Sequence, residues 1–171
     1  MSIVKGPGND KEAVLRQLVA EHQVSLTRLC YLYLHDVQLA EDAVQETFLK
    51  AYRTLDDFRG EASAKTWLTR IAMRTCCDMR RTFWFRRVDR SVTPENLPDC
   101  VGEADDEAAA LTLAVMQLPI REREAVLLYY YQDMNVCEIA KALGVTQPTV
   151  SYRLRRAREK LRRELEGREE P

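Results

Sequence analysis

Apolar residues recur every three or four positions through most of this 171-residue chain. This spacing is typical of amphipathic helices. It predicts helices over residues 11–34, 39–54 and 64–81, then, after a gap, an all-helical segment from about residue 107 that includes a helix over 121–131. The predicted fold class is therefore all-α, with two small helical domains.

The second predicted helix has two distinct faces. Its core face is apolar and comprises Ala40, Ala43, Val44, Phe48, Ala51 and Tyr52, and Leu55 follows on the same side. The opposite face carries Asp42, Gln45, Glu46, Leu49 and Arg53. A leucine on an otherwise polar face indicates a docking surface, and an ordinary solvated helix side is the equal alternative.

The third predicted helix combines basic and aromatic residues. We expect Trp67 or Leu68 to pack inward, and the outward set comprises Lys65, Thr66, Arg70, Arg74 and Arg81. Arginines interleaved with Trp67, Phe83, Trp84 and Phe85 are typical of single-stranded nucleic-acid binding, because bases stack on the rings. Core packing is the alternative for these aromatics. A loop, DDFRGEAS, precedes this helix with Gly60 as its pivot.

Residues 137–163, CEIAKALGVTQPTVSYRLRRAREKLRR, have the spacing of a helix-turn-helix. Ala140 lets two helices cross closely, and Gly144 stands where the first helix must end with a positive φ. Thr146 can cap the second helix, with Pro148 in its first turn. The second helix of such a unit normally enters the DNA major groove.

The faces of this second helix follow from the same periodicity. Val150, Leu154, Ala157 and Leu161 lie at spacings of three and four and should face the core. Positions on or beside the outward face are Thr149, Ser151, Tyr152, Arg155 and Arg156. Arg155 and Arg156 suit either guanine edges or phosphates.

Charge is strongly segregated although the net charge is −1. Residues 146–163 hold seven basic and one acidic residue, and residues 65–90 hold eight basic and two acidic ones. Between these two blocks, residues 94–107 contain six acids and no base. We therefore expect domains over 11–85 and 107–166, joined by a flexible acidic linker over 86–106.

Other features narrow the class of protein. No apolar run approaches a membrane span, and the N-terminus lacks a signal pattern, so a cytoplasmic location without membrane insertion is expected. The five cysteines include no C-x-x-C pair, and two histidines are too few for a metal site. Serine, histidine and acids show no hydrolytic arrangement, so we expect no enzyme, metal or cofactor.

In two blocks, the chain resembles the extracytoplasmic-function (ECF) group of sigma factors, the two-domain members of the sigma-70 family of bacterial RNA polymerase. The first block spans residues 40–81, AEDAVQETFLKAYRTLDDFRGEASAKTWLTRIAMRTCCDMRR, and the second spans residues 118–165. The resemblance implies a promoter-recognition subunit that has no enzymatic activity of its own. It also implies an anti-sigma partner, and a linker that runs toward the RNA exit channel.

The resemblance assigns roles to residues by position. Contacts to the β′ clamp helices of core polymerase would come from Asp42, Gln45, Glu46 and Leu49. Opening and holding the −10 element would involve Phe58, Arg59, Gly60, Ser63, Lys65, Thr66, Trp67, Arg70 and Arg74. The second domain would rest on the β flap and recognise the −35 element through Gln147, Thr149, Ser151, Tyr152, Arg155 and Arg156. Arg74 departs from the asparagine that many members carry there.

Two other classes of protein are alternatives to a sigma factor. A helix-turn-helix regulator with an unrelated sensor domain would need neither the exposed 42–49 face nor a basic-aromatic third helix. A nuclease would need acids clustered in a basic cleft to hold metal, whereas the acids here gather in the linker.

Overall fold

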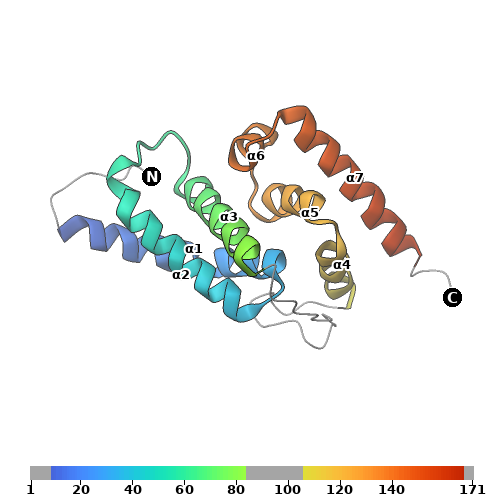
Figure 1. Cartoon of the computed structure of the whole chain (residues 1–171), viewed down its shortest axis with the longest axis horizontal. Coiled ribbons are helices and arrows are strands. Elements are labelled where there is room, and N and C mark those ends of the chain that lie inside the picture. The colour runs from blue at the N-terminus through green and yellow to red at the C-terminus, as the bar shows by residue number, and fades with distance from the viewer. Residues whose placement is uncertain (1–8, 84–105, 168–171) are drawn as a thin grey trace. The chain divides into compact units, whose positions relative to one another are not determined.

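A computed structural model describes residues 9–83 and 106–167 of the chain. These residues divide into an N-terminal and a C-terminal unit (Figure 1). Helices and turns make up both units, and no strand occurs in either described range, which confirms the all-α prediction. The predicted linker, together with Trp84 and Phe85, lies outside the described residues.

The N-terminal unit contains three long helices that pack against one another. They are α1 (Asn9–Leu34), α2 (Val37–Thr54) and α3 (Ala64–Phe83), with a short 3-10 turn, η1 (Leu55–Asp57), after α2. The tight turn between α1 and α2 is closed by Asp36, whose carboxylate accepts a hydrogen bond from the Leu39 backbone N–H at 3.1 Å. This N-cap satisfies one of the open donors of α2.

The core of this unit is built from leucines and small residues. Leu26, Leu29, Leu32 and Leu68 are at most 1% exposed. Most of the predicted core face of α2 is confirmed, because Ala40, Ala43, Val44, Phe48 and Ala51 are buried. Thr47, which the pattern did not place there, is also buried, and Tyr52 is only partly buried. The alanines on this face let the helix axes approach closely. This packing fixes which faces of α2 and α3 point outward.

Two thiols meet inside this core. Cys30 of α1 and Cys76 of α3 are both fully buried. A hydrogen bond with Cys30, reinforced by burial, raises the pKa of the Cys76 thiol well above its ordinary value. The native state therefore holds this proton more tightly than the unfolded chain does. Its contribution to stability is present below the ordinary thiol pKa and is lost as the pH rises above it.

The predicted orientation of Thr66 is wrong. Its side chain is buried, together with Thr69 and Thr75, on the inner side of α3. On the helix, Thr66 lies on the same side as Thr69 and Met73, which are also buried. The buried surface of α3 is therefore wider than the stripe through Leu68, Ala72 and Cys76. Its hydroxyl stays hydrogen-bonded, as a buried polar group must.

The C-terminal unit comprises α4 (Asp106–Gln117), α5 (Ile120–Val126), α6 (Val136–Leu143) and α7 (Gln147–Glu166). The helix predicted over 121–131 changes to π-helical geometry at η4 (Leu127–Tyr131). Apolar periodicity could not distinguish this wider turn from a continuing α-helix. Within η4, Tyr130 is 51% exposed, whereas Leu127 and Leu128 are buried.

The helix-turn-helix is confirmed in its local details. Gly144 ends α6 with φ +66°, and Thr146 caps α7 by accepting from the backbone N–H of Thr149. Asn135 starts α6 in a reciprocal capping box with Glu138. Val150, Leu154 and Ala157 are buried, so α7 presents its predicted face to the core.

The described helices are all too short or too polar to traverse a lipid bilayer. Over residues 9–83 and 106–167, no group of three or more His, Cys, Asp or Glu side chains is arranged to hold a metal ion. The cysteines within these ranges are free thiols.

Candidate nucleic-acid interface

The outward face of α7 is an exposed polar surface. Ser151, Tyr152, Arg155 and Arg156 are all exposed, Tyr152 to 54%. The guanidinium of Arg155 lies 5.5 Å from the centre of the Tyr152 ring. A cation over an aromatic ring restricts both side chains, so this pair is presented in a preferred arrangement.

The first turn of α7 carries the other two predicted residues. Gln147 is exposed, whereas Thr149 is partly buried. The hydroxyls of Thr149 and Thr146 lie 2.9 Å apart, so Thr149 takes part in the helix cap. Its side chain is thereby held in place at the end of the helix that would meet base edges.

Two basic residues of α7 are used inside the unit, which the sequence did not reveal. Arg153 pairs with Glu124 of α5 at 3.6 Å, and both side chains are less than 15% exposed. Lys160 pairs with Glu122 of the same helix at 3.1 Å. The sequence position of Arg153 could have predicted its burial, because Arg153 lies three residues after Val150 and four before Ala157, close to the core face of α7. These two charges fix the helix rather than extend the basic surface.

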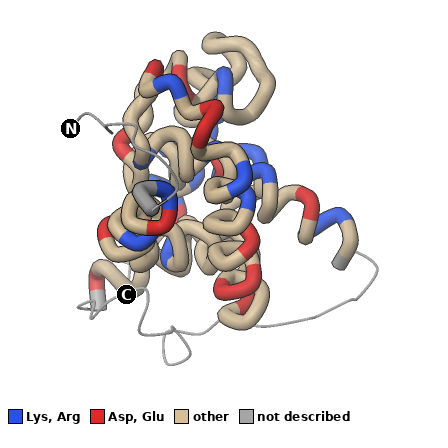
Figure 2. The backbone as a smooth tube through the Cα atoms, turned by 90° about the vertical axis from the view of Figure 1, so that its left-hand side faces the viewer, with Lys and Arg blue, Asp and Glu red and all other residues tan. Residues whose placement is uncertain are grey.

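A third contact holds the other flank of α7. Arg158 donates from Nε to the Tyr130 hydroxyl at 2.9 Å, and its guanidinium lies 5.9 Å from the ring centres of Tyr129 and Tyr130. Those two rings meet edge to face at 4.9 Å. Helix α7 is therefore anchored to both α5 and η4. Charged residues of both signs follow the helices of each unit (Figure 2).

The loop before α3 is exposed and tightly framed. Gly60, the predicted pivot of this loop, has φ +73°, in the left-handed region, and Arg59 and Glu61 beside it are exposed. The rings of Phe58 and Trp67 pack with centres 4.7 Å apart, so two of the residues that the resemblance assigns to the −10 element contact each other. Trp67 is only partly buried, so it is neither fully core nor fully free.

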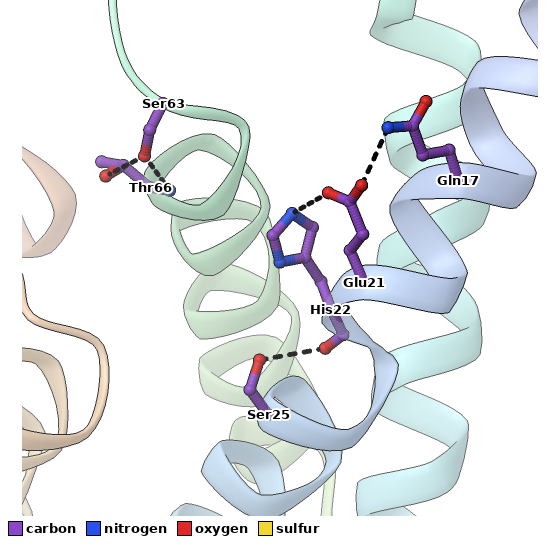
Figure 3. Close-up of polar contacts among 6 residues, drawn as sticks. All are labelled: Gln17, Glu21, His22, Ser25, Ser63 and Thr66. Carbon is purple, nitrogen blue, oxygen red and sulfur yellow. Dashed lines mark hydrogen bonds and ion pairs between the residues drawn. The ribbon is translucent and has the colours of Figure 1, made fainter. Parts of the chain in front are cut away.

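The start of α3 closes this loop. Ser63 accepts from the Thr66 backbone N–H at 3.0 Å and its hydroxyl donates to Thr66 Oγ1 at 2.9 Å (Figure 3). Ser63 is exposed but already used as a helix cap. Farther along α3, Arg74 is exposed, whereas Lys65 and Arg70 are partly buried.

The face of α2 predicted to dock a partner is open. Asp42, Gln45 and Leu49 are exposed, Leu49 to 53%, and Glu46 is partly covered while paired with Lys50 at 3.6 Å. An apolar groove of about 630 Å³ runs beside this face between α1 and α2. Its apolar lining comprises Leu15, Val19, Val44, Phe48, Leu49 and Tyr52. Sequence reasoning found the face but missed the groove, which needs two helices to exist.

The sequence matches two family models, Sigma-70 region 2 over residues 18–86 and Sigma-70, region 4 over residues 108–161. The ECF RNA polymerase sigma factor SigL of Mycobacterium tuberculosis is 34% identical over 172 residues, covering 97% of each chain. SigM of the same species is also 34% identical, covering 87% of this chain and 76% of its own. The RNA polymerase sigma-H factor of Pseudomonas aeruginosa is 31% identical, with coverages of 87% and 84%.

The chain belongs to the ECF sigma factors. It is a promoter-recognition subunit of the sigma-70 family, as the resemblance implied. Because region 2 matches the N-terminal unit, the alternative of an unrelated sensor domain is excluded.

Two solved structures share the fold of this chain. CnrH, in complex with the cytosolic domain of CnrY, shares 29% identity and a TM-score of 0.67, covering 91% of this chain and 90% of CnrH. The sigma factor RpoE of Bartonella quintana, in complex with the anti-sigma factor NepR, has a TM-score of 0.72 at 24% identity, covering 93% and 98%. The second likeness bears on the fold alone.

Proposed function

We propose that the two units of this sigma factor divide promoter recognition between them. The N-terminal unit opens and holds the −10 element, and the C-terminal unit recognises the −35 element as a duplex. One observation carries the proposal: a framed, exposed loop with a positive-φ glycine lies in the first unit, and an anchored helix with an exposed basic face lies in the second. An exposed loop can contact the bases of a DNA strand that unstacks during opening. A helix held in a fixed position can enter the regular major groove of duplex DNA.

At the −35 element, α7 inserts its first turns in the major groove. Contacts to base edges and nearby phosphates come from Gln147, Thr149, Ser151, Tyr152, Arg155 and Arg156. The exposed arginines neutralise phosphates, so binding weakens as salt rises. Arg153 takes no part, because it is paired inside the unit.

At the −10 element, the loop and the exposed side of α3 contact the separated strand. The residues involved are Phe58, Arg59, Gly60, Ser63, Lys65, Trp67, Arg70 and Arg74. Unstacking a base costs a few kcal/mol, which ring stacking and arginine contacts to phosphates offset. Thr66 acts through the loop's shape instead, because it is buried against Ser63.

Core polymerase binds the α2 face. Asp42, Gln45, Glu46 and Leu49 contact the β′ clamp helices, and the C-terminal unit rests on the β flap. An anti-sigma factor competes for these surfaces, a proposal supported by the anti-sigma factor seen with the related RpoE. The chain itself catalyses no reaction and works in the cytoplasm beside the polymerase. Its domain limits are 11–85 and 107–166, on either side of the linker.

The test is transcription in vitro with purified core polymerase and a genomic template library. We expect specific initiation sites with the full chain and none with core polymerase alone. The double variant Asp42→Ala/Gln45→Ala should lose stable binding to core polymerase. Arg155→Ala/Arg156→Ala should keep that binding and lose −35 protection.

The matched control is Arg16→Ala, which removes an exposed charge from α1 outside these surfaces. It should behave like the parent chain in both assays. The proposed function is wrong if the full chain forms no stable complex with core polymerase. It is also wrong if the Asp42→Ala/Gln45→Ala variant initiates transcription like the parent chain.

A further inference from the structure

The first turns of α1 contact the base of the loop that precedes α3. Lys11 Nζ lies 2.8 Å from a carboxylate oxygen of Asp56, a residue 45 positions later in the chain. Asp56 belongs to η1, the turn from which the loop departs. The start of α1 and the end of α2 lie together at one end of the unit, as Figure 1 shows.

The position of Lys11 is fixed by more than this ion pair. Its ammonium lies 4.9 Å from the ring centre of Tyr52 on α2, and its side chain is only 23% exposed. An ammonium over an aromatic ring gains electrostatic attraction, and covering its stem restricts its rotamers. Lys11 therefore bridges α1, the last turns of α2 and η1.

Other contacts hold the remainder of the loop. The Phe58 backbone N–H donates to the Leu55 carbonyl at 3.1 Å, and the Phe58 ring packs on Trp67. Ser63 closes the far end by capping α3. Between these anchors, residues 59–62 form a short tip around Gly60.

We propose that Lys11 is a positioning residue for promoter opening: it fixes η1, so that the loop tip is presented to the −10 strand in a preformed arrangement. The inference rests on the proposed role of this loop at the −10 element. It adds a residue outside the region 2 match, which begins at residue 18. Preformed geometry helps because ordering a loop during binding costs conformational entropy.

The expected size of the effect follows from exposure. The Asp56 side chain is 80% exposed, so the ion pair is screened by solvent and salt. Exposed pairs of this kind change equilibria by about two- to five-fold. A defect in opening should therefore be a few-fold, and it should shrink as salt concentration rises.

The central experiment compares Lys11→Met with the parent chain in complete holoenzyme. Methionine keeps an apolar stem against Tyr52 and removes the charge. Permanganate reactivity of unpaired thymines measures opening on a duplex promoter and on a template already unpaired at the −10 element. We expect Lys11→Met to lower opening about two- to five-fold on the duplex, with no change on the pre-opened template and no change in binding to core polymerase.

Charge reversal provides the rescue. Lys11→Asp should be worse than Lys11→Met, and the double variant Lys11→Asp/Asp56→Lys should recover most of the opening. Arg16→Met is the matched control, since Arg16 lies on the same helix and pairs only weakly with Glu12 at 3.5 Å. It should open promoters like the parent chain.

The experiment distinguishes a failure of the loop's proposed role from a failure of the role proposed for Lys11. If Arg59→Ala leaves opening unchanged, the loop's proposed role is wrong and the inference falls with it. If Arg59→Ala reduces opening while Lys11→Met does not, or if the double charge reversal fails to recover, Lys11 is no positioning residue. An equal defect of Lys11→Met on both templates also overturns the inference, because it would indicate a general structural effect.

Discussion

The two units hold their candidate DNA-binding elements in different ways. In the N-terminal unit, a loop is fixed at its ends by Lys11–Asp56 and by Ser63, with Gly60 in the tip between them. In the C-terminal unit, α7 is fixed along its length by ion pairs to α5 and by Tyr130. We infer that an element meeting DNA that changes shape keeps a free tip, whereas one meeting a regular duplex is anchored throughout.

The largest expected effect comes from the cores beneath the two elements. Leu68→Ala on the inner face of α3 and Leu154→Ala on the inner face of α7 each remove a buried leucine. Each should lower the free energy of unfolding by about 2–5 kcal/mol, measured by urea denaturation. Leu111→Ala, at an α4 position that is 41% exposed, is the control and should change stability far less. Losses below 1 kcal/mol for both core variants would contradict the packing described.

Next in size is the pair that anchors α7. Glu124→Ala leaves Arg153 without this nearly buried partner, and should cost about 2–3 kcal/mol of unfolding free energy. Glu122→Ala affects the more exposed Lys160, 35% exposed, and should cost about 1 kcal/mol or less. Thermal unfolding of the two variants measures the difference. Equal losses would show that burial of Arg153 does not set the strength of the anchor.

The two positive-φ glycines test the comparison directly. Nothing lies within 4 Å of a Cβ added at Gly60 or Gly144, so alanine at either site brings backbone strain without a clash. Each substitution should cost about 1–2 kcal/mol. Gly60→Ala should reduce opening of the −10 element and leave −35 binding unchanged. Gly144→Ala should reduce −35 binding and leave opening of the −10 element unchanged. Footprinting of both elements in one assay checks this, and a shared defect would contradict the division of roles.

The smallest effect is expected for Tyr130→Phe. This change keeps the ring contacts with Arg158 and removes the hydroxyl that accepts its hydrogen bond. The loss should be about 0.5–1 kcal/mol in stability. A parallel titration of −35 duplex binding should show a roughly two-fold loss. No loss in either measurement would show that the Arg158 hydrogen bond does not help to hold α7.

Local signals in the sequence determined much of this protein. Helix periodicity gave α1, α2, α3 and the faces of α7, because burial of an apolar stripe requires a repeat near 3.6 residues. Gly144, Thr146 and Pro148 located the helix-turn-helix, since caps and left-handed turns depend on single residues. The resemblance then supplied the family.

Tertiary structure alone decided what depends on distant partners. Arg153 and Lys160 are two of the seven basic residues over 146–163, and only the packing of α5 beside α7 shows that both are paired within the unit. The sequence pattern predicts that Thr66 faces outward, whereas the packing of α3 buries it. The Lys11–Asp56 bridge and the groove between α1 and α2 need helices that meet only after folding. A sequence records which side chains are available along each helix, but the pairing of charges and the shape of a groove are set by which helices pack together.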